Sequence, residues 1–372
     1  MGVWRAVVAC GLCAVVLSGC AQWRDAREPD QRVQFEPTLA ATELQFQTVE
    51  ETFITPANPP DEVDSVTAWM APDGVRWVIA SGKDSHQLLA FNGDTGALLK
   101  RIGGKGSAPG QFNRPNGVMT WGDLLFVVER DNRRVQVLSL PDLRPLATFG
   151  ESDLRSPYGL SISEPEAGRL DLLVTDSFME GDKFDLIPAF DKLGQRVKRF
   201  SVLIDGDAVS ARLEGAFGDT TAAGALRVVE SIAADPANGR LLIAEEDVPT
   251  GTGYRLYTTA GQYAGRNLGV GEFKAQAEGL ALWACDDGSG YWVGTDQFID
   301  RSLFRVYDRR TLEFLGAFAG KKTAATDGVW LSQAPTARFP AGVFYAAHDD
   351  QAVSAFDWRS IASALALRTE CP

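Results

Sequence analysis

Side chains that can bind cations stand at repeated places in this sequence, beside short apolar runs with the composition of β-strands. One set opens a run in each of six places: Asp64, Asn116, Tyr158, Glu230, Glu278 and Asp327. A second set follows the next apolar run: Glu129-Arg130, Asp176, Glu245-Glu246-Asp247, Asp296 and His348-Asp349-Asp350. Oxygen ligands from several loops suit hard cations, and Ca²⁺ tolerates the irregular geometry that such loops provide. The alternative is that Asp and Glu at strand ends only favour turns and face water.

Residue types and motifs that the sequence lacks exclude several kinds of catalytic site. The chain has two histidines, His86 and His348, so a three-histidine zinc centre and a His-Glu-x-x-His helix are both excluded. It has no Gly-x-Ser-x-Gly elbow, and Gly103-Gly104-Lys105-Gly106 lacks the spacing of a Walker loop. Any reaction here therefore depends on carboxylates, a metal ion and water.

The elements that must position these side chains recur along the chain. Each unit opens with a polar residue and a short strand, then has a glycine-bearing turn and a strongly apolar strand such as 124–128. Six units start near Val66, Gly117, Gly159, Ser231, Gly279 and Gly328, at spacings of 51, 42, 72, 48 and 49 residues. Such periods predict an all-β fold, a six-bladed β-propeller of four-stranded antiparallel blades.

The irregular parts of this repeat lead to further expectations. The long third interval has room for an insertion around Leu203 to Leu226, and the run Leu44 to Ile54 can complete the last blade and close the ring. We expect a short terminal helix near Trp358 to Leu367. Inner strands of a propeller converge on its axis, so the residues that open them are expected to meet at one mouth. The alternative fold, two separate β-sandwiches, does not explain the regular spacing.

The first residues have the pattern of an export signal. Arg5 precedes an apolar run, Ala6 to Leu17, that is too short to span a bilayer. The run ends in Leu17-Ser18-Gly19-Cys20, which resembles a bacterial lipobox. We therefore expect a signal peptide over 1–19, lipidation of Cys20, a tether over 20–43 and a propeller domain over 44–372. Because Ala21 follows the cysteine, we expect an outer-membrane lipoprotein, periplasmic or on the cell surface. An ordinary signal peptide or an uncleaved anchor is the alternative.

Charge and cysteine content limit the partners. The formal net charge is -13, and the sequence has no basic stripe with interleaved aromatic residues, so nucleic-acid binding is not expected. Membrane contact is expected through the lipid anchor only, and the protein is expected to be a monomer. Outside the signal segment two cysteines remain, Cys285 and Cys371, and an oxidising compartment permits a bridge between them without establishing it.

Several segments resemble the β-propeller (alkaline) phytases, calcium enzymes that release phosphate from inositol hexakisphosphate. Glu230-Ser231-Ile232, followed by Ile243-Ala244-Glu245-Glu246-Asp247, is similar to the family's Glu-Gly-Met run and its Ile-Ala-Glu-Glu-Asp. Glu278-Gly279-Leu280 and Thr326-Asp327-Gly328 resemble two further family motifs. The run 339–344 precedes His348-Asp349 as a related run precedes Gln-Asp in the family. The resemblance covers nearly all of residues 60–365, in order.

This resemblance implies a calcium-dependent, 3-phytase-like hydrolase acting on phytate or a related phosphorylated metabolite through a metal-activated water. It implies catalytic roles for Glu230, Glu246 and Tyr158, and substrate binding by Arg130 and Asn116. It also implies the following calcium ligands: Asp64, Glu230, Glu246, Glu278, Asp327 and Asp349.

The sequence departs from the family pattern at several places. Asp176-Ser177 stands where the family has a phosphate-binding lysine, a second lysine is replaced within 110–114, and Gln276 and Lys321-Lys322-Thr323 replace carboxylates. These changes imply weaker calcium and phosphate binding, or a different substrate. The segment 101–117 resembles an NHL repeat, which occurs in propellers that bind ligands or partners. A non-catalytic binding propeller and a calcium-dependent lactonase are therefore the alternative functions.

Overall fold

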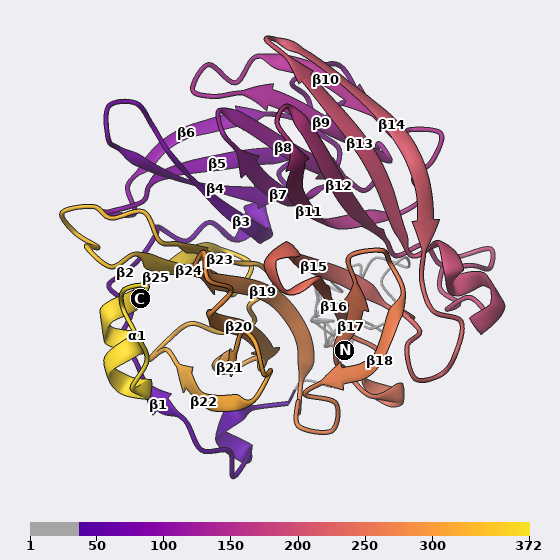
Figure 1. Cartoon of the computed structure of the whole chain (residues 1–372). Coiled ribbons are helices and arrows are strands. Elements are labelled where there is room, and N and C mark those ends of the chain that lie inside the picture. The colour runs from indigo at the N-terminus through magenta and orange to yellow at the C-terminus, as the bar shows by residue number, and fades with distance from the viewer. Residues whose placement is uncertain (1–36) are drawn as a thin grey trace, which may run out of the picture.

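The computed structural model describes residues 37–372, and its strands form six sheets around one axis (Figure 1). The predicted signal peptide, Cys20 and most of the predicted tether lie outside the described residues. The inner strands contact one another in the order β3, β7, β11, β15, β19 and β23, and β23 returns to β3. The predicted six-bladed propeller is confirmed.

Three blades come from the first half of the described chain. Blade 1 contains β3 (Val63–Met70), β4 (Arg76–Gly82), β5 (Gln87–Asn92) and β6 (Leu98–Gly103). Blade 2 contains β7 (Pro115–Trp121), β8 (Leu124–Glu129), β9 (Arg134–Ser139) and β10 (Pro145–Phe149). Blade 3 contains β11 (Pro157–Glu166), β12 (Arg169–Asp176), β13 (Val197–Asp205) and β14 (Ala208–Phe217).

The second half supplies the other three blades. Blade 4 contains β15 (Val229–Asp235), β16 (Arg240–Glu245), β17 (Gly253–Thr258) and β18 (Tyr263–Leu268). Blade 5 contains β19 (Gln276–Ala284), β20 (Gly290–Gln297), β21 (Leu303–Asp308) and β22 (Phe314–Ala319). Blade 6 contains β23 (Val329–Ser332), β24 (Val343–His348) and β25 (Ala352–Asp357). The helix α1 (Trp358–Leu365) follows, as predicted.

The segment before blade 1 divides between two blades. The strand β2 (Phe53–Ile54) pairs with β25 and supplies the fourth strand of blade 6, so the predicted closure of the ring is confirmed. The strand β1 (Gln47–Thr48) instead pairs in parallel with β22 and becomes a fifth strand of blade 5. The preceding 3-10 helix η2 (Leu39–Ala41) buries Leu39 against the same blade.

The extra length of the third unit lies in a different place from the one predicted. Most of 203–226 was expected to be an insertion, but β14 occupies 208–217 as the outer strand of blade 3. The additional residues lie between β12 and β13, where residues 177–196 include the 3-10 helix η4 (Phe190–Gln195). The prediction failed because a long exposed edge strand has little of the apolar alternation that marks a strand.

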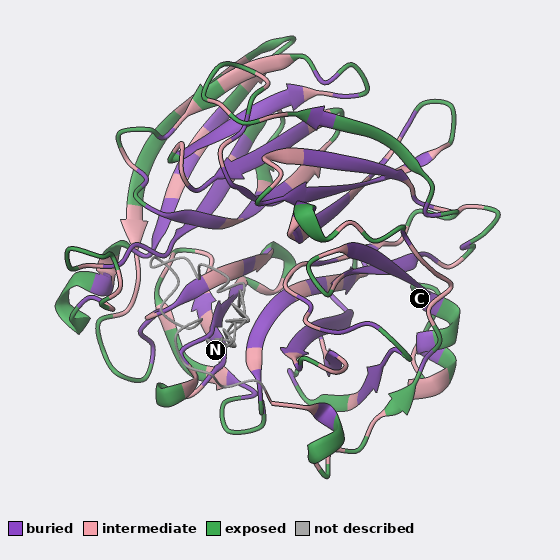
Figure 2. Ribbon diagram, turned by 180° about the vertical axis from the view of Figure 1, so that it is seen from behind, coloured by how far each residue is buried: buried purple, intermediate pink, exposed green. Residues whose placement is uncertain are grey.

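Apolar side chains fill the space between neighbouring blades. Each of six clusters joins two adjacent blades, so every blade buries both of its faces. Figure 2 shows buried residues along the inner strands, whereas the outer strands β6 and β14 are largely exposed. The blades therefore form one continuous ring that holds the inner strands rigidly around the axis.

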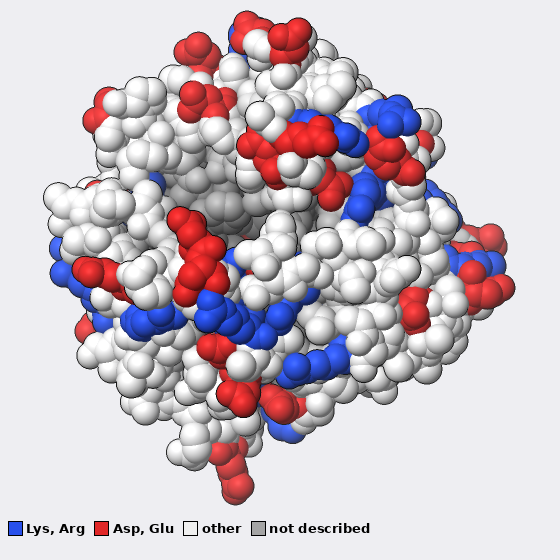
Figure 3. Space-filling model, viewed as in Figure 1, with Lys and Arg blue, Asp and Glu red and all other residues white. Residues whose placement is uncertain are grey.

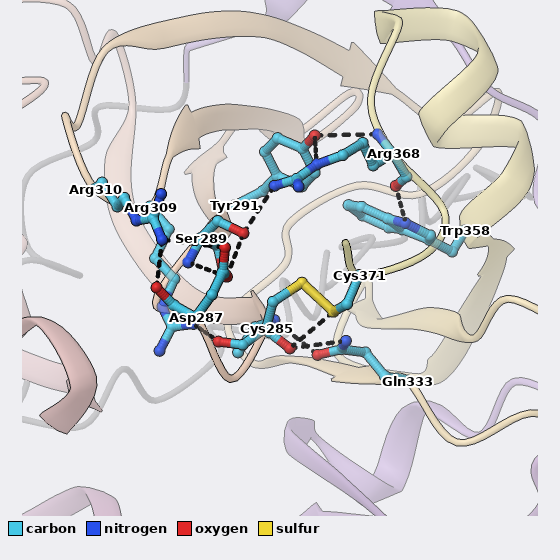
Figure 4. The surroundings of a disulfide bond; sticks show 11 residues. Cys285, Asp287, Ser289, Tyr291, Arg309, Arg310, Gln333, Trp358, Arg368 and Cys371 are labelled. Atoms are coloured by element: carbon cyan, nitrogen blue, oxygen red, sulfur yellow. Dashed lines mark hydrogen bonds and ion pairs between the residues drawn. A yellow bond between two sulfur atoms is a disulfide. The ribbon is translucent and has the colours of Figure 1, made fainter.

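A disulfide between Cys285 and Cys371 ties the C-terminal tail to blade 5 (Figure 4). The tail is further held where the Trp358 indole donates a hydrogen bond to the Arg368 carbonyl at 3.0 Å, and where the Arg368 N–H donates to the Tyr291 hydroxyl at 3.0 Å. The pairing that the sequence left open is therefore present. No helix within residues 37–372 has the length and apolar character needed to cross a membrane.

Candidate metal and substrate site

The six residues that open the inner strands meet at one end of the propeller axis. They line a cavity of about 20 Å³, roughly the space of one water: Asp64, Asn116, Tyr158, Glu230, Glu278 and Asp327. These are the six residues that the sequence repeat placed at a common mouth. We call them the inner ring.

A small residue follows each member of the inner ring and makes the floor of the cavity. These residues are Ser65, Gly117, Gly159, Ser231, Gly279 and Gly328. A Cβ on Gly159 would lie 2.4 Å from the Glu230 carbonyl oxygen, so the neighbouring inner strand leaves no room for it. Gly117, Gly279 and Gly328 approach the next blade in the same way. We call these six residues the collar. It separates the polar mouth from a largely apolar channel of about 220 Å³.

A second ring comes from the residue directly after the second strand or, in blade 5, from the last residue of that strand. Its members are Lys83, Arg130, Ser177, Glu246, Gln297 and Asp349. The Arg130 guanidinium lies 3.4 Å from the Tyr158 hydroxyl, and the Gln297 amide donates a hydrogen bond to Asp327. We call this set the outer ring. Two of its contacts thus reach the inner-ring residue of the next blade.

Three glutamates from the two rings form a compact oxygen cluster. One carboxylate oxygen from each of Glu230, Glu246 and Glu278 lies within 4.8 Å of the other two. Asn116 lines the same cavity as Glu230 and Glu278, and its side chain is 1% exposed. Within the described residues, neither atom of its amide has a hydrogen-bond partner. A buried amide without partners is costly, so a bound ligand in this cavity explains it.

The donor set fits a hard cation. All the candidate ligand atoms are oxygens, from carboxylates and an amide, which is the set that Ca²⁺ prefers. A divalent ion also relieves the repulsion between three clustered carboxylates. The structure therefore brings together four residues that the sequence assigned to metal or substrate: Asn116, Glu230, Glu246 and Glu278.

The opposite side of the mouth has its own cation. The Lys83 ammonium lies 2.9 Å from an Asp64 carboxylate oxygen, 3.4 Å from Glu62 and 3.9 Å from Asp327. Burial raises the pKa of the Asp327 carboxyl well above its ordinary value, and the carboxylates of Asp64 and Asp350 add to the shift, although Lys83 opposes it. Two of the predicted calcium ligands, Asp64 and Asp327, thus lie around an ammonium group rather than in the glutamate cluster.

The remaining predicted ligand lies at the edge of this arrangement. Asp349 is exposed, and its carboxylate accepts a hydrogen bond from the Gln351 amide at 2.9 Å. Asp349 occupies the same outer-ring position as Glu246, one residue beyond the second strand. Its role as a calcium ligand stays a prediction.

Four other acidic residues from the sequence pattern hold the loops of the blades in place and do not belong to the mouth. Glu129, Asp176 and Glu245 end the second strands of blades 2 to 4, and Asp296 is the last residue but one of β20 in blade 5. All four are fully buried, and none lines the cavity. Each accepts backbone N–H groups from the loop before the inner strand, as Asp176 does from Arg155 and Ser156. In blade 6, His348 Nδ1 accepts the Ala324 N–H at 3.2 Å. The alternative from the sequence is therefore correct in part: these side chains hold the loops at the strand ends, but the four carboxylates are buried and do not face water.

Sequence reasoning missed Lys83 as a site residue. One lysine after a strand is not distinctive in a sequence. The signal was its repeat position, since Lys83, Arg130 and Glu246 all stand one residue beyond the second strand. Aligning the six units by their second strands, rather than by their first, identifies it.

A family model described as Phytase matches residues 225–358. The likeness to the β-propeller phytases is confirmed. The phytase-like segment contains Glu230, Glu246, Glu278, Asp327 and Asp349, whereas the other predicted site residues precede it. The NHL-like segment 101–117 lies outside the match and stays a prediction.

Other comparisons give distant likenesses only. No curated protein matches the sequence. A chain of the nidogen/laminin complex is 13% identical with a TM-score of 0.46, over 74% of this chain and 88% of that one. Hydrazine synthase of Kuenenia stuttgartiensis is 11% identical with a TM-score of 0.47, over 81% and 97%. The Dos1 propeller is 12% identical with a TM-score of 0.43, over 82% and 72%. No functional conclusion follows from likenesses at this level.

Proposed function

We propose that this protein is a calcium-dependent phosphomonoester hydrolase of the phytase type. Its substrate would be inositol hexakisphosphate or a related phosphorylated metabolite. The observation that carries the proposal is the glutamate cluster of Glu230, Glu246 and Glu278 beside the unpartnered Asn116 amide, within a propeller whose residues 225–358 match the phytase family. Neither the lactonase nor the non-catalytic binding function has a specific observation in its favour.

The glutamates of the cluster would hold the cation through their carboxylate oxygens. When bound, the ion supplies charge neutralisation at a phosphate and lowers the pKa of a coordinated water. Since four carboxylates line the cavity, the acidic mouth is compatible with an anionic substrate only when the site is loaded.

The other residues of the mouth would orient the phosphate. The guanidinium of Arg130 is 1% exposed and lies beside the Tyr158 hydroxyl, so it can donate paired hydrogen bonds to two phosphate oxygens. The Asn116 amide has a free N–H group for a third oxygen. The collar lies between the cavity and the apolar channel, so a charged substrate would approach from the mouth.

The test is phosphate release by the purified protein from inositol hexakisphosphate and from p-nitrophenyl phosphate, with and without millimolar calcium. We expect release that requires calcium and is lost in Glu230→Gln. The matched control is Glu166→Gln, because the Glu166 side chain is 72% exposed and lies outside the mouth. If correctly folded protein releases no phosphate from either compound in calcium, the proposal is wrong.

We also propose that the protein is a monomeric outer-membrane lipoprotein, attached through a diacylated Cys20. The motif Leu17-Ser18-Gly19-Cys20 supports this proposal. Metabolic labelling with a radioactive fatty acid tests it. We expect label in the wild-type chain and none in Cys20→Ser, and label in both or in neither contradicts it.

A further inference from the structure

The buried cations at the mouth are already bonded to carboxylates. Lys83, Arg114 and Arg130 are between 1% and 7% exposed. Lys83 contacts Asp64 and Glu62, and Arg114 contacts both Glu62 and Asp84 at 3.1 Å. Arg130 contacts Asp131 at 2.9 Å. The fixed positive charge near the site is therefore largely compensated before any substrate arrives.

The compensating carboxylates follow the repeat. In four blades an aspartate comes directly after the outer-ring residue: Asp84, Asp131, Asp247 and Asp350. Because strands alternate in direction, the loops that carry these residues lie at the same end of the propeller as the inner ring. The four aspartates thus form an acidic rim around the mouth, and three of them are themselves paired: Asp84 with Arg114, Asp131 with Arg130 and Asp247 with Arg227.

Acidic and basic side chains lie next to one another on the face drawn in Figure 3. Ser177 and Gln297, the outer-ring residues of blades 3 and 5, are uncharged. Exposed cations of the mouth loops, such as Arg133 and Arg155, keep their water shell and are screened by salt. A second or third phosphate on a substrate would therefore meet the rim carboxylates instead of a prepared cation.

We propose that the site selects compact substrates with a single phosphoryl group and disfavours densely phosphorylated ones. One phosphoryl group at the entrance of the cavity would have both the glutamate cluster and the Arg130 guanidinium as partners, since Arg130 lies beside Tyr158 of the same cavity. Its neighbours on a hexakisphosphate would have to compete with the rim aspartates for the arginines that these aspartates already bind. This inference rests on the proposed phosphatase function and concerns the selectivity of that same site.

The test compares inositol monophosphate with inositol hexakisphosphate on the same protein, at matched free calcium because the hexakisphosphate itself chelates the ion. We expect kcat/KM at least tenfold higher for the monophosphate. Calorimetric titration with inositol hexakissulfate, which this site cannot hydrolyse as a phosphate ester, should show binding weaker than that of inorganic phosphate. An equal or higher kcat/KM for the hexakisphosphate overturns the inference and leaves the proposed function in place. Failure to hydrolyse either compound overturns both.

Variants of the rim give a second measurement. Asp84→Asn and Asp131→Asn remove rim charge next to Arg114 and Arg130, so the hexakisphosphate-to-monophosphate ratio of kcat/KM should rise severalfold. The control is Asp207→Asn, which removes the same charge at a 79% exposed residue paired with Arg144 on the outer hairpin of blade 3. A ratio that changes equally in all three variants shows a general charge effect and overturns the role of the rim.

Discussion

Glu245 and Glu246 are neighbours in the chain and have opposite surroundings. Glu245 ends β16, is fully buried, and accepts the backbone N–H groups of Arg227, Val228 and Asp247. Glu246 lies one residue further and joins Glu230 and Glu278 in the oxygen cluster. Successive side chains of an extended chain point in opposite directions, so one carboxylate faces the loop backbone and the other faces the axis. The comparison teaches that acidity alone does not mark the site, whereas the position relative to the strand end does.

The largest expected effect is a loss of activity on substitution of Glu246, which distinguishes it from Glu245. Glu246→Gln should lower kcat/KM by more than the roughly 10–100-fold typical of losing a residue behind the metal ligands, because a ligand itself loses its charge. The three clustered carboxylates repel one another, so removing the charge of one of them costs no attraction within the cluster. The melting temperature of the calcium-free protein should therefore change little. Steady-state kinetics and calorimetry check both parts. Wild-type activity in this variant would remove Glu246 from the site.

The converse substitution, Glu245→Gln, should act on stability. It leaves backbone N–H groups short of an acceptor and a buried Arg255 without its nearby charge, so we expect a loss of about 3 kcal/mol in the free energy of unfolding. The fraction that remains folded should keep its calcium requirement. Urea unfolding measures the loss. A variant as stable as the wild type, yet inactive, would place Glu245 with Glu246.

A smaller loss of stability is expected on substitution in the collar, which contains neither the buried glutamates nor the glutamate cluster. Gly159→Ala forces a Cβ against the Glu230 carbonyl, and such overpacking costs about 1–3 kcal/mol. The control is Gly194→Ala, where an added Cβ meets nothing closer than 3.9 Å. Thermal unfolding of the two variants checks the difference. Equal stability would mean that the inner strands can move apart.

The smallest expected effect is the release of protons when calcium binds. Burial and the neighbouring carboxylates of Glu62, Asp64 and Asp349 raise the pKa of Asp350 to about 6, so this carboxyl is partly protonated near that pH. A cation at the mouth favours the ionised form, so calcium binding should release protons near pH 6, release few at pH 8, and be tighter at the higher pH. Calorimetry in buffers of different ionisation enthalpy measures the release. The same release at both pH values would contradict the coupling.

The fold was predictable because one steric requirement produces the same residue pattern in all six units of the sequence. Inner strands that meet at an axis need a small residue at the closest approach, so each unit has a polar residue, then Gly or Ser, then an aliphatic residue. That triplet located Glu230, Glu278 and Asp327 correctly, and with them the mouth.

The rest of the site was less predictable, because it depends on the paths of loops. Whether Asp176 or Asp296 meets backbone N–H groups is decided by the segment before the inner strand, and that segment has no fixed pattern. Lys83 was missed for a related reason, since its contact with Asp64 forms across a strand-end turn. The short strand β1 pairs with a blade that its position in the chain does not suggest.

The entry of the chain into the propeller has a mechanical consequence. Ahead of the closing strand β2, the segment is bonded to blade 5 at several places. They include the Leu39 and Ala40 N–H groups on Asp300, β1 beside β22, and the Val49 N–H on the Ala319 carbonyl. A load applied before residue 37 is therefore borne by these bonds first and reaches the β2–β25 seam last. If the proposed lipid anchor holds the chain, blade 5 would bear a pulling force before the ring could open at the β2–β25 pair.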